Sequence, residues 1–210
     1  MKNKNSNRLL KRSLDKIYEI IVFALFSSLV EVLEIDIEVS YSPSKKPILE
    51  EFSDFTSRIL NLSTDKNNFK TKAKIHRVGV TNAADRGLDM WSSFGLAIQI
   101  KHLSLNEEMA ENIVNSITAD RIVIVCKKAE QKIILSLLNQ IGWKSKIQTI
   151  VTEVDLINWY EKALRGENNN LIGHKVIEIL NSEIETEFPA TKNTEFEDFV
   201  KSRNYQLLYT

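Results

Sequence analysis

The stretch RGLDMWSSFGLAIQIKH, from Arg86 to His102, decides how this chain folds. Asp89 ends a short apolar segment in it, and Ser92-Ser93-Phe94-Gly95 is prone to form a turn. The residues from Leu96 to Leu103 then have the composition of a β-strand. The sequence therefore predicts a hairpin that turns at Gly95.

The polar residues of this hairpin fall on one side of it. Side chains alternate between the two faces of a strand, so Gln99 and Lys101 point one way and Ile98 and Ile100 the other. The turn would bring Asp89 beside them. A carboxylate, an amide oxygen and an ammonium group at one strand end suit a hard cation and an activated water. A surface hairpin with a solvated polar face is the alternative.

The spacing of these residues resembles that of a nuclease superfamily. Asp89, nine residues, Gln99, one residue and Lys101 resemble the Asp and (Glu, Asp or Gln)-x-Lys pattern of the PD-(D/E)XK nucleases. The resemblance implies Asp89, Gln99 and the Ile100 carbonyl as Mg²⁺ ligands. It implies Lys101 as the group that orients or deprotonates the attacking water. Gln99 departs from the acidic form, which argues for one metal or for another carboxylate nearby.

A further acid from the preceding helix is often part of such a site. Residues 13 to 33 have the apolar periodicity of a helix, and Glu31 lies near its apolar stripe. We expect Glu31 to be this acid. Glu19 is the other acid within the helix. The alternative is that both glutamates are exposed to solvent. Glu50 and Glu51 are rivals, and Asp85 replaces Asp89 if the register differs.

Composition bounds the class of protein. The 210 residues are 43% hydrophobic and 27% charged, as in an ordinary globular protein, and predict one domain. The formal net charge is zero, so no global basic field marks a nucleic-acid binder. Cys126 is the single cysteine, which excludes an internal disulfide, and its apolar surroundings predict a buried thiol. A reducing cytoplasm fits this usage.

The N-terminus imitates a secretory signal, with a basic leader before the apolar run from Ile20 to Val30. Asp15 and Glu19 interrupt the leader, however, and no small-residue cleavage pattern follows. The run is also shorter than the ~20 residues that span a bilayer. We interpret the segment as a core helix.

Periodicity predicts helices and strands in alternation along the chain. Strands are expected at Ile35–Tyr41, Ala73–Val80, Arg121–Lys127 and Lys146–Thr152, and helices at Ser13–Leu33, Ile48–Leu62, Asn106–Ile117, Ala129–Ile141 and Glu153–Leu164. Asp65 to Asn68 is expected to be a loop. The order indicates an α/β fold, a mixed central β-sheet flanked by helices, in which the hairpin precedes a helix, a buried strand and a helix. Two helices, Leu171–Leu180 and Phe188–Tyr205, would extend it.

That order is the one that the nuclease superfamily has around its catalytic hairpin. Two segments, LDMWSSFGLAIQIKHLSL and NWYEKALRG, resemble type II restriction endonucleases of the HaeII-like kind. The resemblance implies a restriction-endonuclease-like core over residues 13–164, with a helical C-terminal extension over 165–210, in a single nuclease domain. It implies Mg²⁺-dependent hydrolysis of double-stranded DNA at a specific sequence, by a homodimer if the target is palindromic.

Candidate DNA contacts are the basic and amide side chains of loops. Arg77 and Arg86 suit phosphate oxygens, because a guanidinium makes bidentate hydrogen bonds. Lys144, Lys146 and Asn169 are candidates for contacts to bases. Turn chemistry explains the same residues equally well. We treat His102 as structural.

Two other functions remain open at this point. One is a structure-specific or repair nuclease with the same fold. The other is a non-catalytic DNA-binding subunit that keeps the hairpin as a scaffold. Metal-dependent cleavage would distinguish an enzyme from such a subunit.

Overall fold

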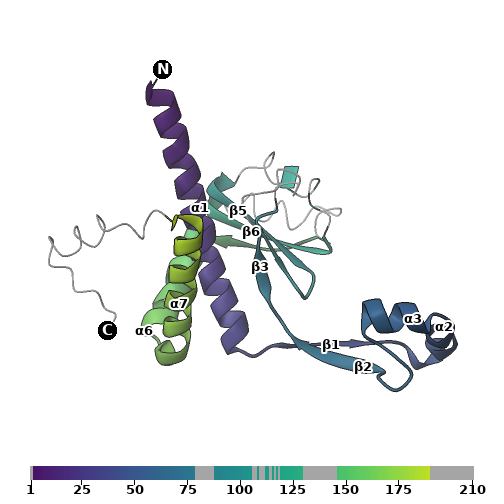
Figure 1. Ribbon diagram of the computed structural model, residues 1–210. Helices are drawn as coiled ribbons and strands as arrows, with labels where there is room; N and C mark the ends of the chain where they lie inside the picture. Colours follow the sequence, from purple (N-terminus) through teal and green to yellow (C-terminus); the bar gives the residue numbers. More distant parts are fainter. Residues whose placement is uncertain are drawn as a thin grey trace.

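A mixed five-stranded sheet lies at the centre of the computed structural model of this chain (Figure 1). The structure describes residues 2–78, 88–105, 108, 112–113, 115, 117, 119–129 and 146–189, with the backbone alone for 2–12, 102–105 and 129. The sheet consists of β3 (Ile75–Arg77), β4 (Met90–Ser92), β5 (Leu96–Leu105), β6 (Arg121–Ala129) and β7 (Ile147–Thr152), in that order. Strands β3, β4 and β5 are antiparallel, whereas β5, β6 and β7 are parallel.

The predicted hairpin is formed by β4 and β5. Met90 pairs with Ile98 and Trp91 with Ala97, so the register is the one that the alternation requires. Gly95 closes the turn with a φ of 81°, a conformation that glycine adopts without steric cost. The strands predicted at Arg121–Lys127 and Lys146–Thr152 are confirmed as β6 and β7.

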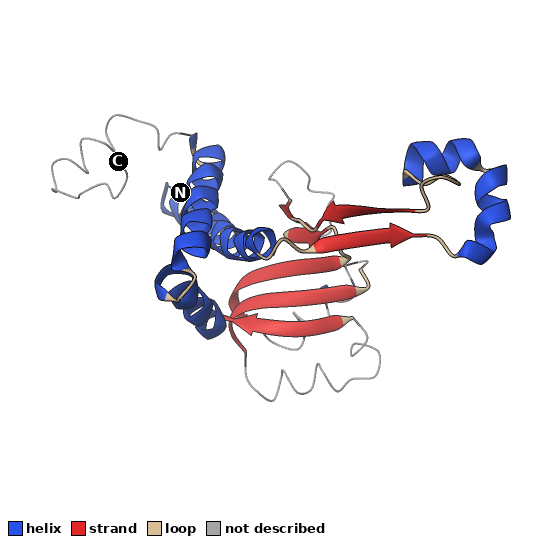
Figure 2. Cartoon of the chain, turned by 90° about the horizontal axis from the view of Figure 1, so that it is seen from below, coloured by secondary structure: helices blue, strands red, loops and turns tan. Residues whose placement is uncertain are grey.

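Three long helices lie on one side of the sheet, where α1 and α6 contact its strands and α7 packs mainly on these two helices (Figure 2). They are α1 (Lys2–Val32), α6 (Glu153–Arg165) and α7 (Asn169–Glu187). A capping box, in which Thr152 and Asp155 bond each other's backbone, starts α6. The Tyr160 hydroxyl donates to the Ile21 carbonyl at 2.7 Å and so ties α6 to α1. The expected mixed sheet flanked by helices is confirmed.

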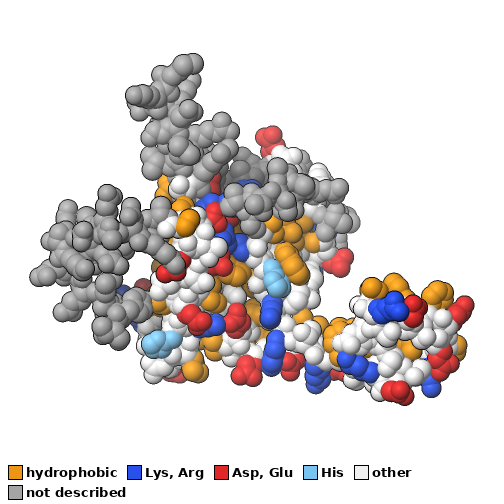
Figure 3. Space-filling model, viewed as in Figure 1, with side chains coloured by type: hydrophobic (Ala, Val, Ile, Leu, Met, Phe, Trp, Pro, Cys, Tyr) orange, Lys and Arg blue, Asp and Glu red, His pale blue; other side chains and the backbone are white. Residues whose placement is uncertain are grey.

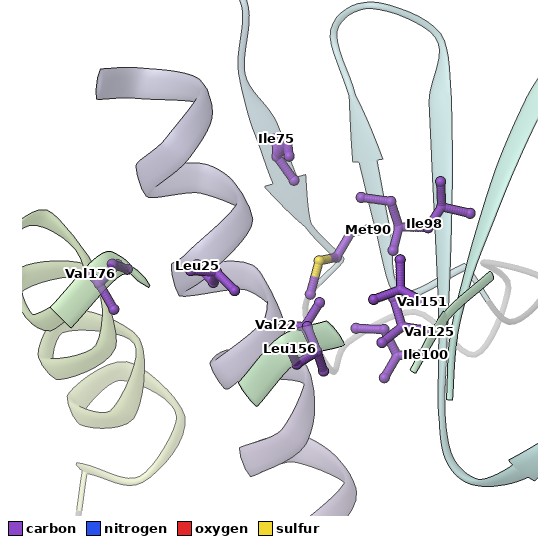
Figure 4. Packing of buried hydrophobic residues seen from close by; sticks show 12 residues of the cluster. Val22, Leu25, Ile75, Met90, Ile98, Ile100, Val125, Val151, Leu156 and Val176 are labelled. Atoms are coloured by element: carbon purple, nitrogen blue, oxygen red, sulfur yellow. The ribbon is translucent and has the colours of Figure 1, made fainter. Parts of the chain in front are cut away.

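The core lies between these helices and the sheet (Figure 4). Val22 and Leu25 of α1 point toward the sheet, where Met90, Ile98 and Val125 meet them. Each such side chain contributes about 1.5–3 kcal/mol when buried. The hydrophobic face of β5 thus holds α1 in a defined position.

The opposite face of the sheet has its own apolar cluster. Ala97, Ile122 and Ile124 pack there with Ile113 and Ile117. Of the described residues between 106 and 118, residues 108, 112, 113 and 115 are helical, as predicted for that segment. Cys126 is buried in this cluster, which confirms the predicted buried strand thiol.

An arm projects away from the sheet (Figure 1). Strands β1 (Asp36–Ser40) and β2 (Asn68–Lys72) form its stem, an antiparallel pair of their own. Its tip holds the short helices η1 (Pro43–Lys45), α2 (Lys46–Glu51), α3 (Ser53–Phe55) and η2 (Thr56–Leu60).

The arm confirms one prediction from periodicity and corrects two. The edge strand expected at 35–41 forms as β1 and pairs with β2 outside the main sheet, whereas part of the expected loop at 65–68 is the start of β2. The single helix expected at 48–62 is broken at Phe52, whose φ of −103° and ψ of 35° are not helical. The apolar side chains there lack a protein surface to pack on, and tertiary packing is what stabilises most helices.

The remaining predictions of strands and helices have different outcomes. The strand expected at 73–80 is shorter, since β3 ends at Arg77 before residues outside the described part. The helix expected at 171–180 is longer, as α7. The helices expected at 129–141 and 188–205 lie almost wholly outside the described residues. No helix in the described part of the chain is long and apolar enough to cross a membrane.

An ion-pair clamp joins the edge of the sheet to α7. The Arg77 guanidinium donates to Glu183 at 2.7 Å and to Glu187 at 2.9 Å, and its side chain is only 8% exposed. The two carboxylates raise the pKa of Arg77 against the opposing effect of burial. The clamp therefore fixes β3 against the end of α7.

Replacement of Arg77 by alanine should destabilise the fold by about 3 kcal/mol, because two partly buried carboxylates lose their counter-charge. Urea denaturation followed by circular dichroism measures the change. The matched control, Arg58→Ala, removes an exposed arginine of the arm and should change stability by less than about 0.5 kcal/mol. Equal effects of the two changes would contradict a structural role for the clamp.

Candidate active site

Asp89 takes the place of a backbone partner at the end of the β4–β5 pairing. It directly precedes β4, and its Oδ2 accepts a hydrogen bond from the Ile100 N–H at 2.6 Å. The Gln99 amide nitrogen donates to the same oxygen at 2.5 Å. The Asp89 carbonyl meanwhile accepts from the Val78 N–H at 2.9 Å. The carboxylate of Asp89 is thus held by β5, and its backbone is held by the residue that follows β3.

The residues of β5 around this carboxylate are arranged as the strand dictates. Gln99 is 2% exposed, and Lys101 lies on the same face and is partly exposed. The N–H and C=O of a strand residue point to the same edge, so the Ile100 carbonyl also faces the Asp89 side. The register between β5 and β6 shifts directly after Lys101, and such irregularities commonly re-aim side chains beside active sites.

Glu19 is an acid of α1 that lies near Asp89. It lies three residues before Val22, on the stripe that packs against the sheet, and it is buried. Lys16 pairs with it at 2.6 Å. Glu19 is close enough to Asp89 to raise the pKa of the Asp89 carboxyl.

Several effects combine to raise the pKa of Asp89 from 3.8 to about 6. Burial is the largest, since it disfavours the charged form. The Ile100 N–H lowers the pKa, Glu19 raises it, and Lys101 and Lys16 lower it. The charged form of Asp89 is therefore disfavoured in this environment. A bound cation would stabilise that form.

The donor set fits a hard divalent cation. Asp89 and Glu19 offer carboxylate oxygens, and the Ile100 backbone offers a carbonyl oxygen. Within the described residues, no three His, Cys, Asp or Glu side chains gather into a metal cage. Mg²⁺ usually keeps several waters and needs only one or two carboxylates, so a small oxygen set is compatible with it.

Glu31 is not part of this group. Its carboxylate pairs with Lys175 of α7 at 3.0 Å and accepts from Ser27. It lies twelve residues after Glu19, about 18 Å along the same helix. Contrary to the expectation from the sequence, the geometry therefore favours Glu19 over Glu31 as the acid near Asp89. The spacing of Glu19 from Val22 was the signal in the sequence that favoured it.

Among the described residues, the fold does not gather the predicted DNA contacts. Arg77, which was expected to contact phosphate, instead donates from Nε to Glu183 and from Nη1 to Glu187. Lys146 directly precedes β7 and so lies at the amino ends of the parallel strands, about 13 Å along the strand direction from the level of Ile100. Asn169 starts α7, which begins where α6 ends. Arg86, Lys144 and Asp85 lie outside the described residues.

A comparison with protein families agrees with this geometry. A model of the HaeII restriction endonuclease family matches residues 1–205. This chain belongs to that family. The resemblance of its hairpin to HaeII-like enzymes is thereby confirmed.

Two curated members of the HaeII family are similar to the chain. The type II restriction enzyme HaeII of Haemophilus aegyptius is 59% identical over 196 residues, which are 93% of this chain and 56% of that protein. The type II restriction enzyme NgoBI of Neisseria gonorrhoeae is 58% identical over 202 residues, 96% of this chain and 57% of that protein. The chain therefore spans little more than half the length of these relatives. No solved structure matches it significantly.

Asp89→Asn should change how stability depends on pH when EDTA is present. A carboxyl whose folded pKa is raised from 3.8 to about 6 contributes stability in full below about pH 4 and loses it as the pH rises through 6. The variant keeps an acceptor for Ile100 but has no charge. Between pH 4 and pH 8, the free energy of unfolding of wild type should therefore fall by about 3 kcal/mol relative to that of the variant.

Thermal unfolding at several pH values measures this difference. Addition of Mg²⁺ at pH 8 should raise the midpoint of wild type and leave that of the variant unchanged. Parallel pH profiles for the two proteins would show that Asp89 is not a desolvated acid.

Proposed function

We propose that this chain is the single nuclease domain of a Mg²⁺-dependent type II restriction endonuclease that hydrolyses double-stranded DNA at a specific sequence. One observation carries the proposal: Asp89 lies beside Gln99 and Lys101 of β5, and Glu19 of α1 lies near Asp89. Membership of the HaeII family favours this function over a repair nuclease.

Each residue has a task in the proposed site. Asp89, Glu19 and the Ile100 carbonyl hold the metal, which would supply Lewis-acid stabilisation to the phosphate oxygens. Gln99 orients Asp89 through its amide nitrogen, and its amide oxygen is a candidate ligand. Lys101 orients the attacking water and offsets the negative charge that develops on the phosphate. As in the resembled superfamily, the product would carry a 5′-phosphate.

The variants Lys101→Ala and Glu19→Gln test the proposal directly. Each should lower the rate of plasmid cleavage, Lys101→Ala by about 10²-fold or more, because one charged group of the transition-state environment is lost. Glu31→Gln is the matched control on the same helix and should cleave like wild type, since Glu31 pairs with Lys175. Cleavage with and without Mg²⁺, followed by sequencing of the ends, measures rate, metal dependence and specificity together.

The roles would be wrong if Lys101→Ala cleaved as fast as wild type. Cleavage at branched junctions in preference to a fixed duplex sequence would favour a repair nuclease. If Glu31→Gln and Glu19→Gln lost the same amount of cleavage activity, the assignment of Glu19 as the metal-binding acid would be wrong.

We also propose that the enzyme is a homodimer and that the tip of the arm contacts a second copy. Large apolar side chains are exposed there, including Phe52 at 53%, Phe55 at 52% and Ile59 at 68% (Figure 3). Phe52 and Phe55 line an apolar groove of about 500 Å³, to which Leu49 and Leu62 also contribute. Exposed patches of this kind mark interaction surfaces.

Charge on the arm favours a second copy as the partner. The tip begins with Lys45 and Lys46 and continues with Glu50, Glu51 and Asp54. A two-fold axis perpendicular to α2 would make the two α2 helices antiparallel, which would place the basic start of one helix opposite the acidic end of the other. Such an arrangement would mirror the symmetry of a palindromic target.

Phe55→Glu should therefore convert a dimer to a monomer, because it places a charge in the apolar contact. Light scattering after size-exclusion chromatography measures the mass. The matched control is Leu171→Glu, which changes an apolar side chain of similar exposure on α7 and should leave the dimer intact. A monomeric wild type would exclude this contact, and loss of the dimer in both variants would argue against the arm.

A further inference from the structure

Two aromatic rings stack on the surface of the sheet next to the proposed site. His76 of β3 and Trp91 of β4 are paired residues, with ring centroids 4.2 Å apart and planes inclined by 22°. Trp91 is 44% exposed although it lies in the middle of a three-residue strand whose other two members are buried. A large, rigid ring is therefore presented to solvent from a well-anchored position.

The stack lies on the same face of the sheet as the proposed catalytic side chains. Trp91 pairs with Ala97, and alternation along β5 places Ala97, Gln99 and Lys101 on one face. Diagonal neighbours such as Trp91 and Gln99 lie about 7–8 Å apart. That spacing corresponds to about two base-pair steps of 3.4 Å along the axis of a DNA helix.

A cross-strand aromatic pair also stabilises a sheet, by roughly 0.2–1 kcal/mol. That role does not require exposure, and it does not account for the position beside Asp89. Lys74 adds a positive charge on the same face: the Ser93 N–H donates to its carbonyl, so the ladder and its alternation extend to it. An indole face, an imidazole and an ammonium group together match a sugar–phosphate backbone, which offers apolar deoxyribose and anionic oxygens.

We propose that His76 and Trp91 form a platform for the sugar–phosphate backbone of the DNA strand whose phosphate lies at Asp89. The inference rests on the proposed nuclease function and adds two positioning residues to it. Trp91 packs against deoxyribose, and His76 holds the indole ring in place and donates to a phosphate oxygen. Because these contacts read no base edges, they strengthen binding to all sequences alike and set the register of the strand over the site.

Fluorescence anisotropy tests binding, with labelled duplexes, Mg²⁺ and the Lys101→Ala background to prevent cleavage. Trp91→Ala should weaken binding about tenfold, and by the same factor on the cleaved sequence and on an unrelated duplex. DNA should quench the fluorescence of Trp91, so Trp91→Phe should lose part of the quenching. Trp159→Phe is the matched control, because Trp159 lies on α6 against Phe26, and it should keep both affinity and Trp91 quenching.

Steady-state cleavage separates positioning from a general loss of structure. In the otherwise native protein, Trp91→Ala and His76→Ala should raise KM several-fold while kcat stays within about twofold, and Trp91→Phe should restore most of the KM. If wild type cleaves DNA and Trp91→Ala shows unchanged KM, affinity and quenching, this inference alone fails. If wild type neither binds nor cleaves duplex DNA, the proposed function fails and the platform with it.

Discussion

One hydrogen bond, from the Ile100 N–H to the Asp89 carboxylate, links the stability of the sheet to its chemistry. The β4–β5 ladder ends at the Met90–Ile98 pair, and the next inward N–H of β5 needs an acceptor because an unpaired buried donor costs about 1–3 kcal/mol. Asp89 supplies that acceptor with a side chain instead of a carbonyl. The Asp89 carboxylate is thereby held in one orientation beside β5.

The same constraint explains why α1 matters to the site. Its apolar stripe packs on the face of β5 opposite Gln99 and Lys101, and the stripe ends one turn before Val22, where Glu19 and Lys16 replace hydrocarbon. Two carboxylates are therefore close together with partial compensation from lysines. Burial of Asp89 is the main reason for its raised pKa, and the nearby Glu19 adds to it.

Positive charge near the sheet is used in two different ways. Arg77 is buried and clamps β3 to α7, and the Arg121 guanidinium donates to the Phe94 carbonyl at the hairpin turn. Lys101 and Lys74 by contrast remain at the surface of the catalytic face. A zero net charge is thus compatible with DNA binding, because the few cations that matter are placed beside the site and arginines elsewhere serve the fold.

The sequence by itself determined the hairpin, its register and the gathering of Asp89, Gln99 and Lys101, because side-chain alternation and a glycine turn are local properties. The strands β6 and β7 were also predicted from local sequence. In β6, a continuous apolar run indicates a buried strand. Only the tertiary structure showed that Glu19, and not Glu31, lies near Asp89, and that Arg77 is engaged in ion pairs. It also showed that β1 lies outside the main sheet and that His76 stacks on Trp91. Each of these depends on which surfaces meet across distant parts of the chain, and periodicity within one segment carries no information about the segment it will face.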